Sequence, residues 1–181
     1  AFNGDANGTT NRHTEEYNGS SWSIGGTPLS NANYSNFDGS GTQNDAMLLG
    51  SNYSTGQSQN YNGSVWMVGG TMSNNLGFSG QAGASVNTSL AFGGYDSNLI
   101  NDITCTEEYN GTSWSAGGAL ITGRQSLAGT GTQTAALAVG GGTVGGVGSC
   151  TEEYDGTSWT VSGALSTARC ALAGAGIQNA A

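Results

Sequence analysis

A nine-residue motif occurs four times in this chain and constrains its fold more than any other feature. Residues 14–22, 58–66, 106–114 and 151–159 each contain a Tyr followed by Asn-Gly or Asp-Gly, and each ends in Trp. Successive tryptophans are 44 to 48 residues apart. A repeat of this length is typical of architectures in which each unit stacks on its neighbours, because one unit alone cannot bury its apolar face. The sequence therefore predicts four copies of one small structural unit.

The Asn-Gly or Asp-Gly dipeptide of each motif predicts a tight β-hairpin. Both central residues of a type I′ turn need positive φ, which Asn, Asp and Gly tolerate best. Pairing across Asn18-Gly19 sets Tyr17 opposite Ser20 and Glu15 opposite Trp22. Since side chains alternate along a strand, this register puts the Tyr and the Trp on the same face of the hairpin as diagonal neighbours. We expect the pairs to pack between neighbouring sheets: Tyr17 with Trp22, Tyr61 with Trp66, Tyr109 with Trp114, and Tyr154 with Trp159.

The rest of each repeat predicts further strands and no helices. A stretch of small residues follows each Trp and leads to a strand such as residues 88–94 or 134–141. The chain has 33 glycines, which penalise helices, and it shows no sustained apolar period of 3.6 residues. The prediction is an all-β fold with about four strands per repeat, forming a single domain over residues 1–181.

Several motif positions recur in phase and resemble the kelch motif of β-propellers. These are a strand ending in Gly-Gly, the sequence Glu-x-Tyr-Asn/Asp-Gly, a Trp five residues after the Tyr, and an Arg ten residues after the Trp. Arg124 and Arg169 take the Arg position in the later repeats, whereas the earlier repeats have no Arg there and the second has Leu76. The resemblance implies a kelch-type β-propeller, which is a ring of four-stranded sheets, and a structural role for Arg124 and Arg169. The repeats also resemble kelch-like proteins of marine phages, which implies a virion, tail-associated or extracellular location.

The two ends of the chain resemble the two halves of one strand. Residues 1–5 resemble residues 91–95, and residues 176–181 resemble residues 131–136. We expect residues 177–181 to pair beside residues 1–4 or to run on toward them, because ring closure removes unpaired sheet edges. Closure within one chain gives a four-bladed ring, and closure between two chains gives an eight-bladed homodimer. The dimer is favoured, because the kelch propellers that the chain resembles usually have more than four blades.

Composition argues against several classes of partner. The net charge is −9 and the only formal cations are three arginines, so binding to a nucleic-acid backbone is not expected. No apolar run reaches the 18 residues needed to span a bilayer, so no membrane partner is predicted. Cys105, Cys150 and Cys170 are predicted to be free, packed thiols, because equivalent sites on stacked sheets lie about 10 Å apart.

The residues with catalytic potential do not form a recognisable site. His13 is the only histidine, so neither a histidine metal site nor a Ser/His/Asp triad is predicted, and no cofactor is expected. Adjacent glutamates recur before the Tyr, but neighbouring residues of a strand point to opposite faces and do not converge on one substrate atom. We expect the first Glu of each pair to hold a neighbouring backbone or Arg and the second to face outward. A glycoside-acting enzyme is therefore the least favoured function, and the prediction is that the protein is not an enzyme.

The segments between the Gly-Gly strand and the repeated motif differ from one repeat to the next. They are residues 5–11, 51–57, 95–102 and 142–148. We predict that a ligand binds there, with Tyr53 and Tyr95 stacking on a sugar and Asp96 accepting from a hydroxyl. The favoured function is a non-enzymatic binding module that presents these loops to a host-surface glycan. The alternative is an architectural propeller that mediates assembly with virion proteins.

Overall fold

The computed structural model describes residues 2–6, 9–29, 38–49, 56–74, 76–96, 101–143 and 145–181. Every regular element in this part of the chain is a β-strand, and all strand pairs are antiparallel. The predicted all-β class is therefore confirmed. Tyr53 lies outside the described residues.

Three sheets have four strands each, and the last two strands of each sheet are the hairpin of the repeated motif. In every one of them the strands are paired in chain order. We name each sheet by its first strand. The β4 sheet has β4 (Asp38–Thr42), β5 (Asp45–Leu49), β6 (Gln57–Tyr61) and β7 (Trp66–Thr71); the β8 sheet has β8 (Gly80–Gly83), β9 (Ser89–Phe92), β12 (Thr106–Tyr109) and β13 (Trp114–Ala116); the β14 sheet has β14 (Ala128–Thr132), β15 (Ala135–Val139), β18 (Thr151–Tyr154) and β19 (Trp159–Val161).

A further sheet, the β2 sheet, has three strands: β1 (Phe2–Ala6), β2 (Thr9–Tyr17) and β3 (Trp22–Ile24). Phe2 pairs with Thr14, as Phe92 pairs with Thr106 in the β8 sheet. The β2 sheet therefore matches the last three strands of a complete repeat. Two small hairpins complete the fold: β10 (Tyr95–Asp96) with β11 (Asn101–Asp102), and β16 (Gly142–Thr143) with β17 (Gly146–Val147).

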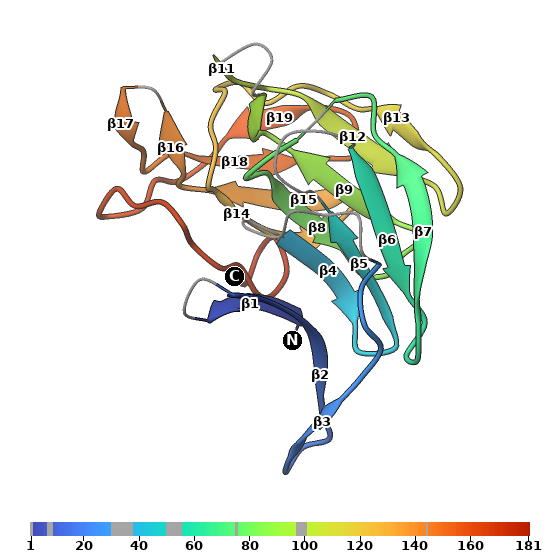
Figure 1. Ribbon diagram of the computed structural model, residues 1–181. Helices are drawn as coiled ribbons and strands as arrows, with labels where there is room; N and C mark the ends of the chain where they lie inside the picture. Colours follow the sequence, from blue (N-terminus) through green and yellow to red (C-terminus); the bar gives the residue numbers. More distant parts are fainter. Residues whose placement is uncertain are drawn as a thin grey trace.

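The first strands of the four-stranded sheets, β4, β8 and β14, lie next to one another in the middle of the molecule, and β7 and β13 lie toward its outside (Figure 1). Small residues permit this close approach. A Cβ added at Gly129 in β14 would lie 2.2 Å from the carbonyl oxygen of Gln81 in β8, which is far below contact distance. Successive sheets therefore pack around a common centre through their backbones, an arrangement compatible with a β-propeller-like fold.

The core lies between successive sheets, and the expected Tyr/Trp pairs fill it in three of the four repeats. Tyr154 and Trp159 pack with Leu90, Phe92 and Leu120 of the β8 sheet and the loop that follows it. The rings of Phe92 and Trp159 are 4.7 Å apart. Tyr109 with Trp114, and Tyr61 with Trp66, are buried in the same way against the preceding sheets. Burial of large aromatic side chains is the main apolar contribution to each interface.

The first pair departs from the prediction. Tyr17 is 47% exposed and Trp22 is 56% exposed, because no sheet in the described part of the chain covers their face of β2 and β3. Arg169 is also exposed, whereas Arg124 at the same repeat position is 2% exposed. The expectation that Tyr17, Trp22 and Arg169 belong to the core is therefore wrong for this chain by itself.

The predicted free thiols are confirmed, although they are not equally packed. Cys105 and Cys150 are half-buried and Cys170 is exposed. Burial, together with the nearby charges of Glu107 and Asp96, raises the pKa of the Cys105 thiol. Cys170 lies at the surface because the segment that follows Arg169 has no sheet over it on one side.

The C-terminal residues form a turn. An isolated bridge joins Ile177 to Ala180, and among the described residues β1 pairs with β2 alone. Closure by pairing of residues 177–181 with residues 1–4 of the same chain is therefore not seen in this part of the structure.

Candidate functional site

Each buried Trp forms a hydrogen bond to the preceding sheet. Its indole Nε1 donates to a hydroxyl at the first position of the preceding motif: Trp66 to Thr14 at 2.8 Å, Trp114 to Ser58 at 3.3 Å, and Trp159 to Thr106 at 2.9 Å. A buried indole N–H needs such an acceptor. This hydrogen bond was not predicted from the sequence, although Thr or Ser recurs eight residues before each Trp and was the available signal.

Each buried Tyr also reaches the preceding sheet. Tyr154 donates to Glu108 at 2.6 Å, and Tyr61 donates to Glu16. Gly118 N–H donates to the Tyr154 hydroxyl at 3.3 Å. Burial, and next the hydrogen bond to Glu108, raise the pKa of Tyr154 to about 12. The expectation that the second Glu of each pair faces outward is therefore wrong for Glu16 and Glu108, because a following sheet covers that face of the strand.

Glu107 and Glu152, the first glutamates of the later two pairs, hold the loops that enter their own sheets, as expected. Glu107 accepts from the backbone N–H groups of Ser73 and Asn74, both at 2.9 Å. Glu152 accepts from Ile121 N at 2.7 Å and from Thr122 N at 3.3 Å. Glu152 also forms a buried ion pair with Arg124 at 3.1 Å. These carboxylates are committed to structural hydrogen bonds, which leaves them no free role in acid–base chemistry.

The connection that follows each Gly-Gly strand carries a hairpin, which we call a rim hairpin: β10–β11 and β16–β17. Their bases are held identically. Gly94 N–H donates to Arg124 O at 2.8 Å, and Gly141 N–H donates to Arg169 O at 3.0 Å. Both glycines have positive φ, +107° and +102°, and a side chain there would strike the neighbouring segment. The bases are thus fixed by the fold, whereas the hairpin sequences differ.

Tyr95 and Asp96, two of the three residues predicted to bind a sugar, form strand β10 of the first rim hairpin. Tyr95 is half-buried in β10, and its backbone pairs with Gly77. Asp96 is only 8% exposed, so its assignment as a surface acceptor for a sugar hydroxyl is wrong. Asp96 is covered because pairing with Asn101 in β11 and the bridge from Tyr95 to Gly77 hold β10 against the body of the protein. The predicted site is therefore reduced to Tyr95, since Tyr53 is outside the described residues.

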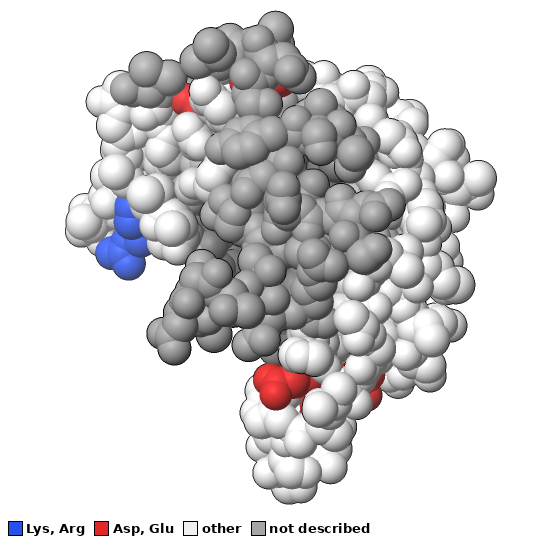
Figure 2. Space-filling model, viewed as in Figure 1, with Lys and Arg blue, Asp and Glu red and all other residues white. Residues whose placement is uncertain are grey.

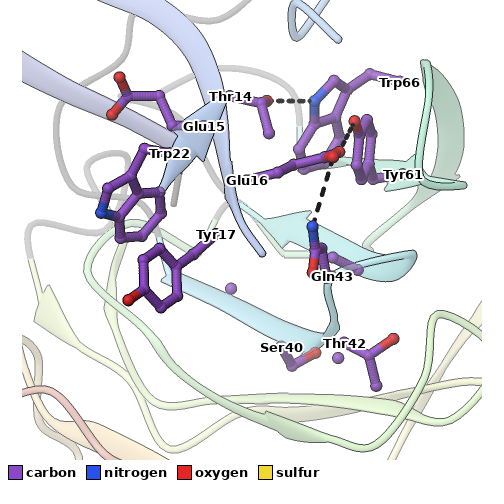
Figure 3. Close-up of a pocket in the computed structure, with 13 residues that line it drawn as sticks. Thr14, Glu15, Glu16, Tyr17, Trp22, Ser40, Thr42, Gln43, Tyr61 and Trp66 are labelled. Carbon is purple, nitrogen blue, oxygen red and sulfur yellow. Dashed lines mark hydrogen bonds between the residues drawn. The ribbon is translucent and has the colours of Figure 1, made fainter. Parts of the chain in front are cut away.

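A cavity of about 330 Å³ lies between β2–β3 and the β4 sheet (Figure 3). Thr14 and Glu16 point from one face of β2 toward Trp66 and Tyr61. Glu15, Tyr17 and Trp22 lie on the other face of the hairpin, which we call the head face. The floor of this cavity, the head cavity, includes the backbone of β4 around Gly39 and Gly41.

A second cavity, of about 380 Å³, lies at the opposite end of the stack of sheets. We call it the tail cavity. Apolar and hydroxyl side chains of the β14 sheet form one wall, and residues 172–175 form another. The residues that matter for its chemistry are Thr130, Leu137, Val139, Thr151, Leu165 and Arg169.

Charged side chains are sparse on the visible surface. Figure 2 shows a basic patch at the left, over the C-terminal segment, and an acidic patch at the bottom, over β2 and β3. No group of three or more His, Cys, Asp or Glu side chains in the described ranges could hold a metal ion. None of the described residues belongs to a helix able to cross a membrane.

Comparison of the chain with protein-family models and with curated proteins gave no match. The kelch resemblance therefore rests on the motif residues themselves.

Proposed function

We propose that this protein is a non-enzymatic binding module of the kelch-type β-propeller class. Its sheets form a closed ring, and its rim hairpins present a surface to a host-cell glycan, either on a phage particle or as a secreted protein. One observation supports this proposal above all: the rim hairpins share the same anchored base but carry different sequences. Binding residues are commonly found on variable loops that a rigid scaffold positions.

The hydrogen bonds of the Glu107, Glu108 and Glu152 carboxylates agree with a non-catalytic role for these residues. Glu107 and Glu152 are buried at 1% and 0% exposure, and their oxygens accept backbone N–H groups. Glu108 accepts from Tyr154. A general acid or base must reach a substrate and needs a free proton-transfer position, which these three carboxylates do not offer.

A glycan array with the intact chain tests the proposal. We expect binding to a restricted set of glycans, and weaker binding after Tyr95→Ala, because an aromatic face near the rim supplies stacking area for a sugar ring. Val68→Ala is the matched control, since Val68 is 60% exposed on the outer strand β7, away from the rim hairpins. Unchanged affinity for every bound glycan in Tyr95→Ala would remove Tyr95 from the site.

The second candidate is an architectural module that joins proteins within a particle. The observation that favours it is the position of the exposed aromatic pair: Tyr17 and Trp22 lie on an end face of the stack of sheets, not on the rim. Silence across the array, together with capture of virion proteins by the immobilised chain, would favour this function over glycan binding.

A further inference from the structure

The interfaces between the β4 and β8 sheets and between the β8 and β14 sheets follow one rule. The Tyr and Trp of the later sheet pack on the face of the preceding sheet that carries two apolar positions of its second strand. For Trp159 these positions are Leu90 and Phe92, and Leu120 closes the side. The hydroxyl acceptor is Thr106, which pairs with Phe92 across the strands.

The tail cavity reproduces this set of positions with no aromatic pair in it. Leu137 and Val139 in β15 stand where Leu90 and Phe92 stand in β9, because Val139 pairs with Thr151 as Phe92 pairs with Thr106. Leu165 corresponds to Leu120 in the loop that follows the outer strand. All these residues of the β14 sheet line the tail cavity, including the prospective acceptor Thr151. The cavity is therefore shaped for a Tyr/Trp pair.

The head face carries such a pair in the required geometry. The ring centroids of Tyr17 and Trp22 are 5.1 Å apart with an interplanar angle of 40°. The buried pair of Tyr154 and Trp159 has 4.9 Å and 33°. The pair is thus arranged as in the interfaces while still exposed to solvent. An exposed pair of large aromatic side chains is typical of an interaction surface.

Residues 172–181 form the complementary element at the tail end. Gln178 Nε2 donates to Ala136 O at 3.0 Å and Tyr154 O at 2.8 Å, as Gln133 Nε2 donates to Ser89 O at 3.1 Å and Tyr109 O at 2.8 Å. A Cβ at Gly174 would lie 2.3 Å from Gly129 O, so this segment approaches β14 as β14 approaches β8. Residues 172–181 therefore have the geometry of the first strand and turn of another sheet.

The β2 sheet is the sheet that this segment would complete. It has three strands where the others have four, and the head cavity opens beside it against β4. The charges also match, since the buried pair of Arg124 with Glu152 has its repeat equivalents in Arg169 at the tail and Glu15 at the head. Figure 2 places the basic and acidic patches at these two ends.

We infer that the head face of one chain binds the tail cavity of a second copy, while residues 172–181 of that copy enter the head cavity of the first. The occupant is a second copy because, among the described residues, those of the β2 sheet line the head cavity and not the tail cavity, and those beyond Trp66 do not line the head cavity. Two chains related by a two-fold axis form two identical seams, and together they make one closed ring of eight sheets.

Within each seam, Trp22 Nε1 donates to Thr151 of the second copy, and Tyr17 donates to Glu153, by analogy with the three internal interfaces. Arg169 pairs with Glu15. The inference does not depend on glycan binding, because it concerns the end faces of the stack and not the rim.

The mass of the intact chain in solution, measured by light scattering after size exclusion, tests the seam. One chain has a mass of 18.1 kDa, and we expect twice that value. Trp22→Ala should weaken association by about 30-fold or more at each seam, the loss typical of a central aromatic anchor, whereas Val68→Ala should leave the mass unchanged. A single-chain mass for the intact protein, or an unchanged dimer in Trp22→Ala, would overturn the inference.

A charge exchange provides a second test on exposed residues that do not endanger folding. Arg169→Glu and Glu15→Arg should each weaken the dimer, and the double variant should recover association, because the pair is restored with its signs reversed. Lack of recovery would refute the Arg169–Glu15 contact. A negative glycan array with an intact dimer would refute the proposed glycan binding alone.

Discussion

Replacement of Arg124 by Leu removes a buried side chain that forms hydrogen bonds to the β14 sheet from the loop that precedes it. Arg124 is 2% exposed and donates to Gly140 O at 2.8 Å, to Cys150 O at 2.6 Å and to the Glu152 carboxylate at 3.1 Å. Leu is the natural choice, because Leu76 occupies the same repeat position in the β8 sheet and is itself buried.

The expected loss of folding stability comes from the Glu152 carboxylate, which Arg124→Leu leaves without its ion-pair partner. Glu152 is 0% exposed and would keep only its two backbone donors, Ile121 and Thr122. Removing one partner of a buried ion pair costs about 3–5 kcal/mol, since the remaining charge is buried without compensation. In the β8 sheet the Asn74 side chain donates to Glu107 at 3.1 Å, whereas the side chain that donates to Glu152 is Arg124 itself. We therefore expect the upper part of this range.

The double variant Arg124→Leu with Glu152→Gln tests the physical reason. Gln59 stands at the corresponding position of the β4 sheet and accepts from Leu29 N at 2.8 Å without a charge. We expect the double variant to lose at least about 1 kcal/mol less than the sum of the single losses, as contacting residues are non-additive.

Urea unfolding at one fixed protein concentration measures these changes, since association affects apparent stability. Val161→Ala is the control, because Val161 is 63% exposed on β19 of the same sheet and should change stability by less than about 0.5 kcal/mol. A loss below about 1 kcal/mol for Arg124→Leu, or strict additivity in the double variant, would refute the assigned role of the buried pair.

Two further predictions concern the interfaces between sheets. Trp114→Ala should cost about 3–5 kcal/mol as a large-to-small core change, and it also removes the hydrogen bond to Ser58; a loss under about 1 kcal/mol in an equilibrium melt would argue against its burial. The pKa of Tyr154 is raised from 10.0 to about 12 in the folded protein, so as the pH rises the Tyr154 hydroxyl ionises first in the unfolded chain. The contribution of the protonated Tyr154 hydroxyl to folding stability is therefore complete below pH 10 and is lost as the pH rises toward 12. Tyr154→Phe should flatten the fall in urea midpoint over this window, and an identical slope in both proteins would contradict the assignment.

Local sequence was sufficient for the strands, for the position of each turn and for the shared face of Tyr and Trp. The predicted type I′ turn and its register are wrong: only the Gly of Asn18-Gly19 has positive φ, and Tyr17 pairs directly with Trp22 across residues 18–21, not with Ser20. Repetition then predicted that equivalent positions have equivalent surroundings, which is correct for Tyr109 and Tyr154, for Trp114 and Trp159, and for Glu107 and Glu152. These properties depend on short-range geometry, so one repeat contains the information for them.

The position of each repeat within the stack of sheets decided which of its motif residues are buried and which are exposed. Trp22 and Trp159 occupy the same motif position, yet one is 56% exposed and the other 5%, because in the described part of the chain Trp159 packs on a preceding sheet and Trp22 does not. Arg169 and Arg124 differ for the same reason, and Asp96 is covered by a long-range bridge at its hairpin base that no local pattern indicates. Burial depends on which segments meet in space, so the end faces, where identical motifs lack their neighbours, emerge only from the tertiary structure.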